Sequence, residues 1–68
     1  MYREVFPSRV KNARIQAGFT QRELAEETGI SASTIAKYET GQLEPDLEKL
    51  GILAEFFQKP ADYFIGRA

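Results

Sequence analysis

The apolar residues of this chain recur at helical spacing, and short groups containing Gly or Pro separate the apolar segments. Val10, Ala13 and Ala17 share one face of a helix that we expect from about Pro7 to Ala17. Pro7 suits the first turn of this helix, and Gly18 suits the position just after its end. No segment has the convincing alternation of a half-buried strand.

The next two expected helices begin at polar capping residues and are joined by a very short connection. Thr20 and Glu23 have the spacing of a capping box, which marks the start of a helix. Ser31 caps the following helix, which runs to about Tyr38, and Gly29 can adopt the positive φ that an abrupt turn needs. The apolar residues expected to hold this pair on the core are Leu24, Ala25, Ile30 and Ile35.

Two more helices are expected in the C-terminal part of the chain. After a loop at 40–45, a helix runs from about Asp46 to Gln58, and a short last helix covers Pro60 to Ile65. The pattern therefore predicts an all-α fold, a compact five-helix bundle. The core-facing sector of the fourth helix is expected to contain Leu47, Leu50, Leu53, Ala54 and Phe57.

Length and composition restrict the chemistry. The 68 residues predict one domain, 1–68, that must rely on a well-packed core, because the chain has no Cys for disulfides. Without Cys or His there is no Cys/His zinc site, no Cys nucleophile and no His acid or base. None of the ten carboxylates sits beside a recognisable catalytic partner. We expect no enzyme, no metal ion, no cofactor and no small-molecule ligand.

The charge balance argues only weakly for a nucleic-acid partner. The net charge is −1, whereas a basic domain is the usual footprint of nucleic-acid binding. Residues 1–40 carry six basic and five acidic side chains, and residues 41–68 carry three basic and five acidic ones. No apolar run approaches the length of a membrane span, and the first residues do not resemble a signal peptide, so we expect a cytoplasmic protein without a membrane partner.

The most informative segment is the pair of helices at residues 20–39. Two helices joined by a turn of three or four residues that contains Gly describe a helix-turn-helix. If Ile35 points inward, Ser33 and Lys37 point outward together, flanked by short side chains. In the major groove, Lys can donate to guanine, Ser and Thr can contact several bases, and Ala can touch a thymine methyl.

The chain resembles the phage repressor and Cro family, the Xre-type helix-turn-helix regulators. The matching segments are SRVKNARIQAG, FTQRELAEETGIS, STIAKYETG, EP and DYFIG, which together span about residues 6–66. The resemblance implies a lambda-repressor-like DNA-binding domain from a bacterial or phage source. It also implies a sequence-specific transcriptional regulator of the repressor kind, which binds a near-palindromic duplex operator as a homodimer and is associated with the nucleoid when bound.

The resemblance also implies roles for individual residues. Arg14 pairs with Glu39, and a structural role for this pair outweighs a sequence-reading one. Ser31 has a second interpretation as a helix cap only. The residues expected to read bases are Ala32, Ser33 and Lys37. The residues expected at the DNA backbone are Thr20, Gln21, Ser31, Thr34, Thr40 and Gln42, with the loop from Thr40 to Gln42 offering backbone amides to phosphate.

Some residues depart from the family pattern. Glu44 stands in a loop where a phosphate would favour Lys, and Ala32 and Ser33 are too short for bidentate base contacts. Lys59 and Pro60 replace a small apolar residue followed by Ser, which leaves the start of the last helix less defined. We therefore expect modest affinity from a monomer and a strong dependence on pairing.

A second apolar stripe offers a surface for pairing. Ile52 and Phe56 lie about opposite the core face of the fourth helix, and Ile15 is similarly off the core face of the first. The stripe is either covered by Tyr2, Val5 and Phe6 or exposed as a homodimer surface. The candidates for that dimer surface are Ile52, Phe56 and Tyr63.

A second function class stays open at this point. The helix-turn-helix scaffold could serve as a protein-interaction or antitoxin-like module, which the acidic isoelectric point near 5.3 and the apolar stripe favour slightly. Retention on heparin or nonspecific DNA at low salt distinguishes the two functions, because a protein-binding module has no reason to bind a polyanion.

Overall fold

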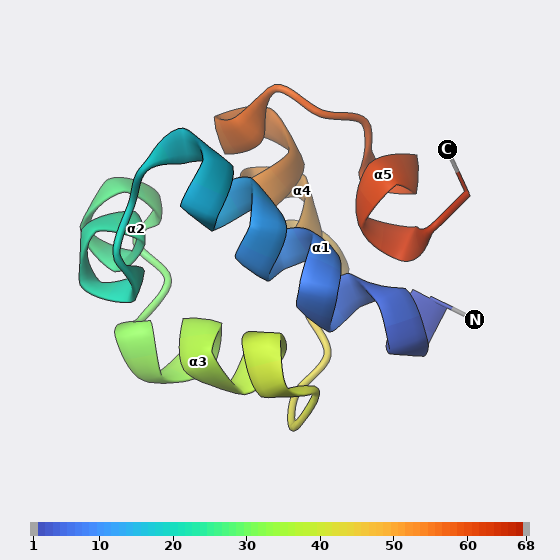
Figure 1. Cartoon of the computed structure of the whole chain (residues 1–68), viewed down its shortest axis with the longest axis horizontal. Helices are drawn as coiled ribbons and strands as arrows, with labels where there is room; N and C mark the ends of the chain where they lie inside the picture. The colour runs from blue at the N-terminus through green and yellow to red at the C-terminus, as the bar shows by residue number, and fades with distance from the viewer. Residues whose placement is uncertain (1, 68) are drawn as a thin grey trace.

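The computed structural model describes residues 2–67, with side-chain surroundings for residues 4–67 (Figure 1). In this part of the chain it contains five helices and no strand, which confirms the predicted all-α five-helix bundle. The helices are α1 (Tyr2–Ala17), α2 (Gln21–Thr28), α3 (Ala32–Thr40), α4 (Leu47–Phe57) and α5 (Ala61–Ile65).

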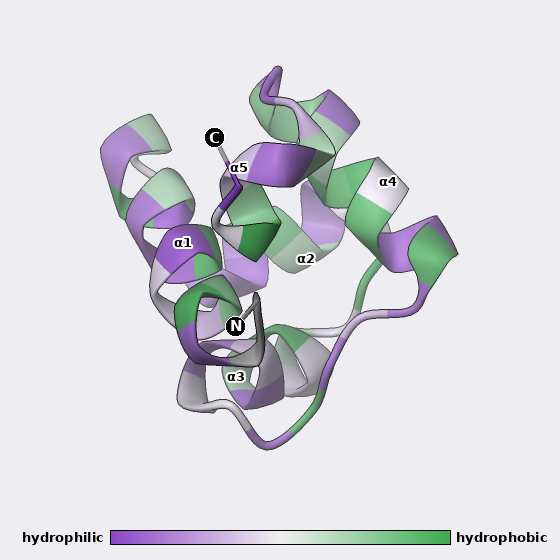
Figure 2. Cartoon of the chain, turned by 90° about the vertical axis from the view of Figure 1, so that its right-hand side faces the viewer, coloured by the Kyte–Doolittle hydropathy of each residue, from purple (hydrophilic) through white to green (hydrophobic). Residues whose placement is uncertain are grey.

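All five helices contribute to one hydrophobic core. In Figure 1, α1 runs through the middle of the molecule, α3 lies below it and α5 lies beside its N-terminal half. Figure 2 shows hydrophobic and hydrophilic residues alternating around α1 and α4. The buried hydrophobic residues are Phe6, Val10, Ala13, Leu24, Ile30, Ile35, Tyr38, Leu53 and Phe64.

The predicted start of the first helix is wrong, because α1 begins at Tyr2 and contains Pro7 within it. A proline inside a helix removes one backbone hydrogen bond and costs about 3 kcal/mol. Packing outweighs that cost here. Phe6 is buried, and its ring centroid lies 5.5 Å from that of Tyr38 and 6.4 Å from that of Phe64. Local propensity cannot register such distant contacts, which supply most of a helix's stability in a folded protein.

Two residues on the predicted apolar faces are exposed. Ala17 follows Val10 and Ala13 on the same stripe but lies in the last turn of α1, where its surface is open to solvent. Leu47 is 87% exposed at the first position of α4, and the core-facing side of that helix begins at Leu50. Helical periodicity extends an apolar stripe to both ends of a helix, whether or not a neighbouring helix covers the terminal turns.

Of the two alternatives for the stripe at Ile52 and Phe56, covered or exposed, the structure shows a largely covered stripe. Both side chains are half-buried and pack against the core. The Phe56 ring meets Phe19 at 5.4 Å and Phe57 at 5.1 Å between centroids, so Phe19 provides its cover. Of the three residues proposed as cover, Phe6 and Val5 pack elsewhere, and the Tyr2 side chain lies outside the described part. Ile15, by contrast, is 55% exposed, as expected for an off-face residue.

Local capping signals define the two central helices. Thr20 and Glu23 form the predicted capping box, in which the Glu23 N–H donates to Thr20 Oγ1 at 3.0 Å and the Thr20 N–H donates to Glu23 Oε1 at 2.9 Å. Gly29 ends α2 with φ +78°, and Ser31 caps α3. α3 continues to Thr40, a little beyond the expected end at Tyr38. These bonds fix the sharp turn between α2 and α3.

Alanine at Gly29 and at Gly51 should have opposite effects on stability. A Cβ would meet nothing within 4 Å at either position, so only the backbone conformation differs. Gly29→Ala should cost about 1–2 kcal/mol, because its φ of +78° is unfavourable for an L-residue. Gly51→Ala, inside α4, should stabilise the chain by about 0.5–1 kcal/mol. Urea unfolding followed by circular dichroism measures both, and equal effects would contradict the conformational explanation.

Candidate nucleic-acid interface

α3 has a buried face and a polar exposed face. Ile35 and Tyr38 are buried in the core, and burial, helped by the nearby Asp46 carboxylate, raises the pKa of the Tyr38 hydroxyl. Ser33 and Lys37 are both exposed on the opposite side, four residues apart. Ala32, Thr34 and Ala36 are half-buried beside them. This exposed surface, formed by Ser33 and Lys37 with its short flanking residues, is called the outer face of α3 below.

The hydroxyl groups at the N-terminus of α3 bind each other. Ser31 Oγ accepts the Thr34 N–H at 3.1 Å, which makes Ser31 the cap of α3. Its own hydroxyl donates to Thr34 Oγ1 at 2.9 Å. This bond does not use the Thr34 hydroxyl hydrogen.

The loop after α3 uses its backbone amides within the chain. The N–H groups of Gly41, Gln42 and Leu43 donate to the carbonyl oxygens of Lys37 and Tyr38, closing the C-terminus of α3. The sequence-based expectation assigned amides at positions 40–42 to phosphate. The amides of Gly41 and Gln42 are therefore engaged within the chain.

A buried ion pair links three helices beneath this surface. Arg14 Nε donates to Glu39 Oε2 at 2.7 Å and Arg14 Nη2 donates to Glu39 Oε1 at 3.0 Å. The Arg14 and Glu39 side chains are 13% and 4% exposed. The hydrogen bonds to Glu39 raise the pKa of Arg14, although burial acts in the opposite direction. Each member of the ion pair also has a further partner. Arg14 Nη1 donates to the Phe19 carbonyl, between α1 and α2, at 2.9 Å. Gln21 Nε2, at the start of α2, donates to Glu39 Oε1 at 3.1 Å.

The bond between Gln21 and Glu39 was missed by sequence reasoning, which assigned Gln21 to DNA alone. The two residues are 18 positions apart, and no local spacing rule joins the start of one helix to the end of another. Arg22 was not among the predicted site residues, and its side chain is exposed in the first turn of α2.

Inward-facing Glu39 makes the outer face of α3 free of exposed acid. The helix has one acidic residue, Glu39, and Arg14 neutralises it below the surface. The exposed charge of α3 is therefore the ammonium group of Lys37. The acids of α2, including Glu26 and Glu27, are exposed on a neighbouring helix. Although the whole chain is slightly acidic, the outer face of α3 carries a positive charge.

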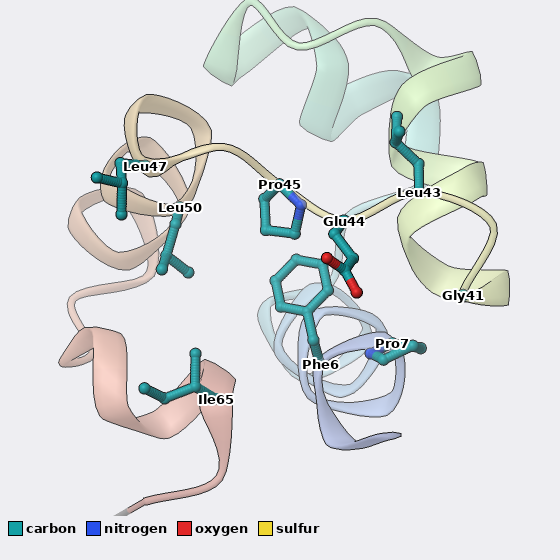
Figure 3. Close-up of a pocket in the computed structure, with 9 residues that line it drawn as sticks. All are labelled: Phe6, Pro7, Gly41, Leu43, Glu44, Pro45, Leu47, Leu50 and Ile65. Atoms are coloured by element: carbon teal, nitrogen blue, oxygen red, sulfur yellow. The ribbon is translucent and has the colours of Figure 1, made fainter. Parts of the chain in front are cut away.

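A second surface feature is an apolar groove of about 500 Å³ next to the C-terminal end of α3 (Figure 3). Pro45, from the connection between α3 and α4, lies next to the ring of Phe6, while Leu50 and Ile65 line the other side. Leu47 projects at the outer edge of this groove. The remaining lining residues are Pro7, Gly41, Leu43 and Glu44.

The described part of the chain holds neither a cluster of metal-ligating side chains nor a helix suited to a membrane. Among residues 2–67, no three His, Cys, Asp or Glu side chains gather closely enough to hold a metal ion. None of the described helices combines the length and apolar character that crossing a membrane requires.

The short helix α2, the sharp turn at Gly29 and the helix α3 make this a helix-turn-helix protein. A family model described as helix-turn-helix matches residues 10–64, and the chain belongs to this family, the Xre-type regulators.

The relatives found among curated proteins are regulators. The HTH-type transcriptional regulator ImmR of Bacillus subtilis is 36% identical over 59 residues, which cover 87% of this chain and 46% of ImmR. The HTH-type transcriptional regulator AnsR of the same species is 36% identical, with 87% and 51% covered. The cryptic phage CTXphi transcriptional repressor RstR of Vibrio cholerae is 32% identical, with 82% and 50% covered. The chain thus spans about half the length of these relatives. No solved structure matches it significantly.

Proposed function

We propose that this chain binds duplex DNA in a sequence-specific manner and regulates transcription as a repressor, in the cytoplasm at the nucleoid. The observation that carries the proposal is the outer face of α3, where Lys37 and Ser33 are exposed and the helix's own acid is turned inward against Arg14. Such a face fits the major groove, which admits an α-helix and presents donors, acceptors and methyl groups. The names of ImmR and RstR support a regulatory role.

The proposed contacts divide into base contacts and backbone contacts. Lys37 and Ser33 would donate to base edges, and Ala32 would meet a thymine methyl. The first amides of α2 have no partner within that helix, which suits a phosphate near Gln21. The residues proposed at the DNA backbone are Thr20, Gln21, Ser31, Thr34, Thr40 and Gln42, to which we add Arg22.

Selection from a randomised pool of DNA duplexes tests this function. Sequencing of the bound fraction should recover one enriched motif, and its affinity should fall with salt at a log–log slope of about −0.9 per phosphate neutralised. A protein-interaction or antitoxin-like role is the second candidate, favoured by the acidic isoelectric point and by the groove at Leu47. No enrichment even at low salt would favour that second role.

Lys37→Ala should weaken binding to the selected motif by about 1–3 kcal/mol, if its ammonium group reads a base. Fluorescence anisotropy against the motif and against single-base variants measures the loss. Lys59→Ala removes the same charge beside Tyr63, away from the outer face of α3, and serves as the matched control. An equal loss on every sequence would assign Lys37 to a phosphate instead.

We also propose that the chain pairs with a second copy of itself on a near-palindromic operator. Two copies related by a two-fold axis would present their α3 helices about 34 Å apart, one turn of DNA. Ile52 and Phe56 are half-buried, and Tyr63 lies between Lys59 and Arg9, so this stripe offers little open apolar surface.

The edge of the groove is the stronger candidate for the dimer surface. Leu47 is an exposed apolar side chain beside a groove lined by apolar residues, so two copies could each insert a leucine into the other, as a two-fold interface requires. Charged side chains of both signs flank Leu47 in the sequence. Lys49 Nζ lies 3.9 Å from Asp46 Oδ2 and 3.9 Å from Glu48 Oε1, close to the limit of an ion pair. These loosely paired groups can meet opposite charges on a second copy.

Leu47→Ser should shift the chain from dimer toward monomer in sedimentation experiments. It should also weaken operator binding, since each half-site would then be bound separately. Ile15→Ser removes another exposed apolar side chain, on α1, and should leave the association unchanged. A Leu47→Ser chain that still forms dimers with wild-type affinity would exclude this surface, and Ile52→Ser then tests the other stripe.

A further inference from the structure

The carboxylate of Glu39 accepts more hydrogen bonds than its ion pair requires. Arg14 donates twice to it, at 2.7 Å and 3.0 Å, which satisfies both oxygens of the buried group. Gln21 donates a third bond, from Nε2 to Oε1 at 3.1 Å. This third bond reaches from the buried pair to the first residue of α2, at the edge of the proposed DNA surface.

The third bond determines how the Gln21 side chain is oriented. A carboxylate paired with arginine can only accept hydrogen bonds, so the amide nitrogen of Gln21, and not its oxygen, must face Glu39. The amide group is planar, so directing one N–H at Glu39 restricts the directions that the second N–H and the carbonyl can take. Gln21 is half-buried, so the residue keeps some solvent-accessible surface at the start of α2.

We propose that Glu39 is a positioning residue, which holds the Gln21 amide in the orientation that donates its second N–H to a DNA phosphate. The proposal rests on the proposed function, because it assigns a DNA contact to Gln21. Glu39 itself is buried and does not touch the DNA. From the last turn of α3, Glu39 holds the side chain of Gln21 in the first turn of α2. The ion pair that joins the helices therefore also orders the Gln21 amide before DNA binds.

The bond to Gln21 distinguishes this role from a purely structural one. Arg14 ties α3 to α1 through Glu39 and to the α1–α2 connection through the Phe19 carbonyl, without help from Gln21. Loss of the Gln21 bond should therefore affect DNA affinity more than folding. Ordering one flexible side chain corresponds to about a three- to tenfold change in affinity, which sets the expected size of the effect.

A double-mutant cycle on DNA affinity tests the proposal. Glu39→Asp keeps the charge for Arg14 but withdraws the carboxylate from Gln21 by one methylene group. We expect it to weaken binding to the selected operator about three- to tenfold in the wild-type background and to have no effect in a Gln21→Ala background. Glu27→Asp, at an exposed position on α2, is the matched control. Urea midpoints identify any variant that is not fully folded, and the affinities are compared at a temperature at which every variant is folded.

The side-chain amide signals of Gln21 provide a readout that a structural role would not move. In ¹⁵N-labelled wild type they should be displaced from those of the exposed Gln16, and in Glu39→Asp they should move toward them. Equal loss of affinity in both backgrounds, or an unchanged Gln21 signal, would overturn the positioning role while leaving DNA binding intact. A wild-type chain that binds no duplex would instead overturn the proposed function, and the role of Gln21 with it.

Discussion

Phe64→Ala is expected to destabilise the fold by about 3–5 kcal/mol, the usual range for removing a buried aromatic ring. Phe64 is completely buried, and its ring meets those of Phe6 and Phe57 at 6.4 Å and 6.2 Å between centroids. It is the buried residue of α5, so its loss would also release that helix from α1 and α4. A chain of this length has a total stability of roughly 3–10 kcal/mol, so much of the protein should be unfolded.

Thermal unfolding followed by far-ultraviolet circular dichroism measures this effect. Ile15→Ala is the control, because Ile15 is 55% exposed and its removal should change stability by less than about 0.5 kcal/mol. A folded Phe64→Ala chain with a nearly unchanged midpoint would mean that α5 contributes little to the core.

The helix-turn-helix could be predicted from the sequence because its signals are local. Thr20 and Glu23 are three residues apart, and their reciprocal bonds begin α2. Ser31 caps α3 through Thr34, also three residues away. Gly29 adopts the positive φ that its place in the turn requires. Each of these features depends on neighbours in the chain, so spacing alone was sufficient to find them.

The errors occurred where distant contacts decide the structure. The start of α1 was predicted at Pro7, but the helix begins at Tyr2. Phe6 packs against Tyr38 of α3 and Phe64 of α5, and these contacts stabilise the additional turn. Leu47 was predicted in the core and is exposed, because no other helix covers the first turn of α4. Whether a terminal turn is covered depends on the arrangement of the other helices, which periodicity does not contain.

In the candidate site, too, some features follow from local sequence patterns and others depend on distant contacts. The exposure of Ser33 and Lys37 follows from the helical wheel once Ile35 is buried. The pairing of Arg14 with Glu39 came from family resemblance, since the two residues are 25 positions apart. The bond from Gln21 to Glu39 was found by neither route and needed the three-dimensional arrangement of α2 and α3.

Arg14→Met should destabilise the fold by about 3–5 kcal/mol, because it leaves the Glu39 carboxylate buried without its positive partner. The methionine keeps much of the volume of the arginine stem, so the loss reports charge and hydrogen bonding rather than a cavity. Gln21 would still donate one bond to Glu39, but a neutral amide does not balance a buried charge. Urea unfolding of the variant beside wild type measures the cost.

The double variant Arg14→Met, Glu39→Met distinguishes the net contribution of the ion pair to stability from the cost of losing only one partner. Replacing both members of a buried ion pair by apolar residues of similar size is often neutral or stabilising. We therefore expect the double variant to recover most of the stability that Arg14→Met loses. Its binding to the selected operator should nevertheless stay weaker than that of wild type, because Gln21 has lost the carboxylate that orients it. Full recovery of both stability and affinity would reduce the Arg14–Glu39 pair to a structural element without influence on the DNA surface.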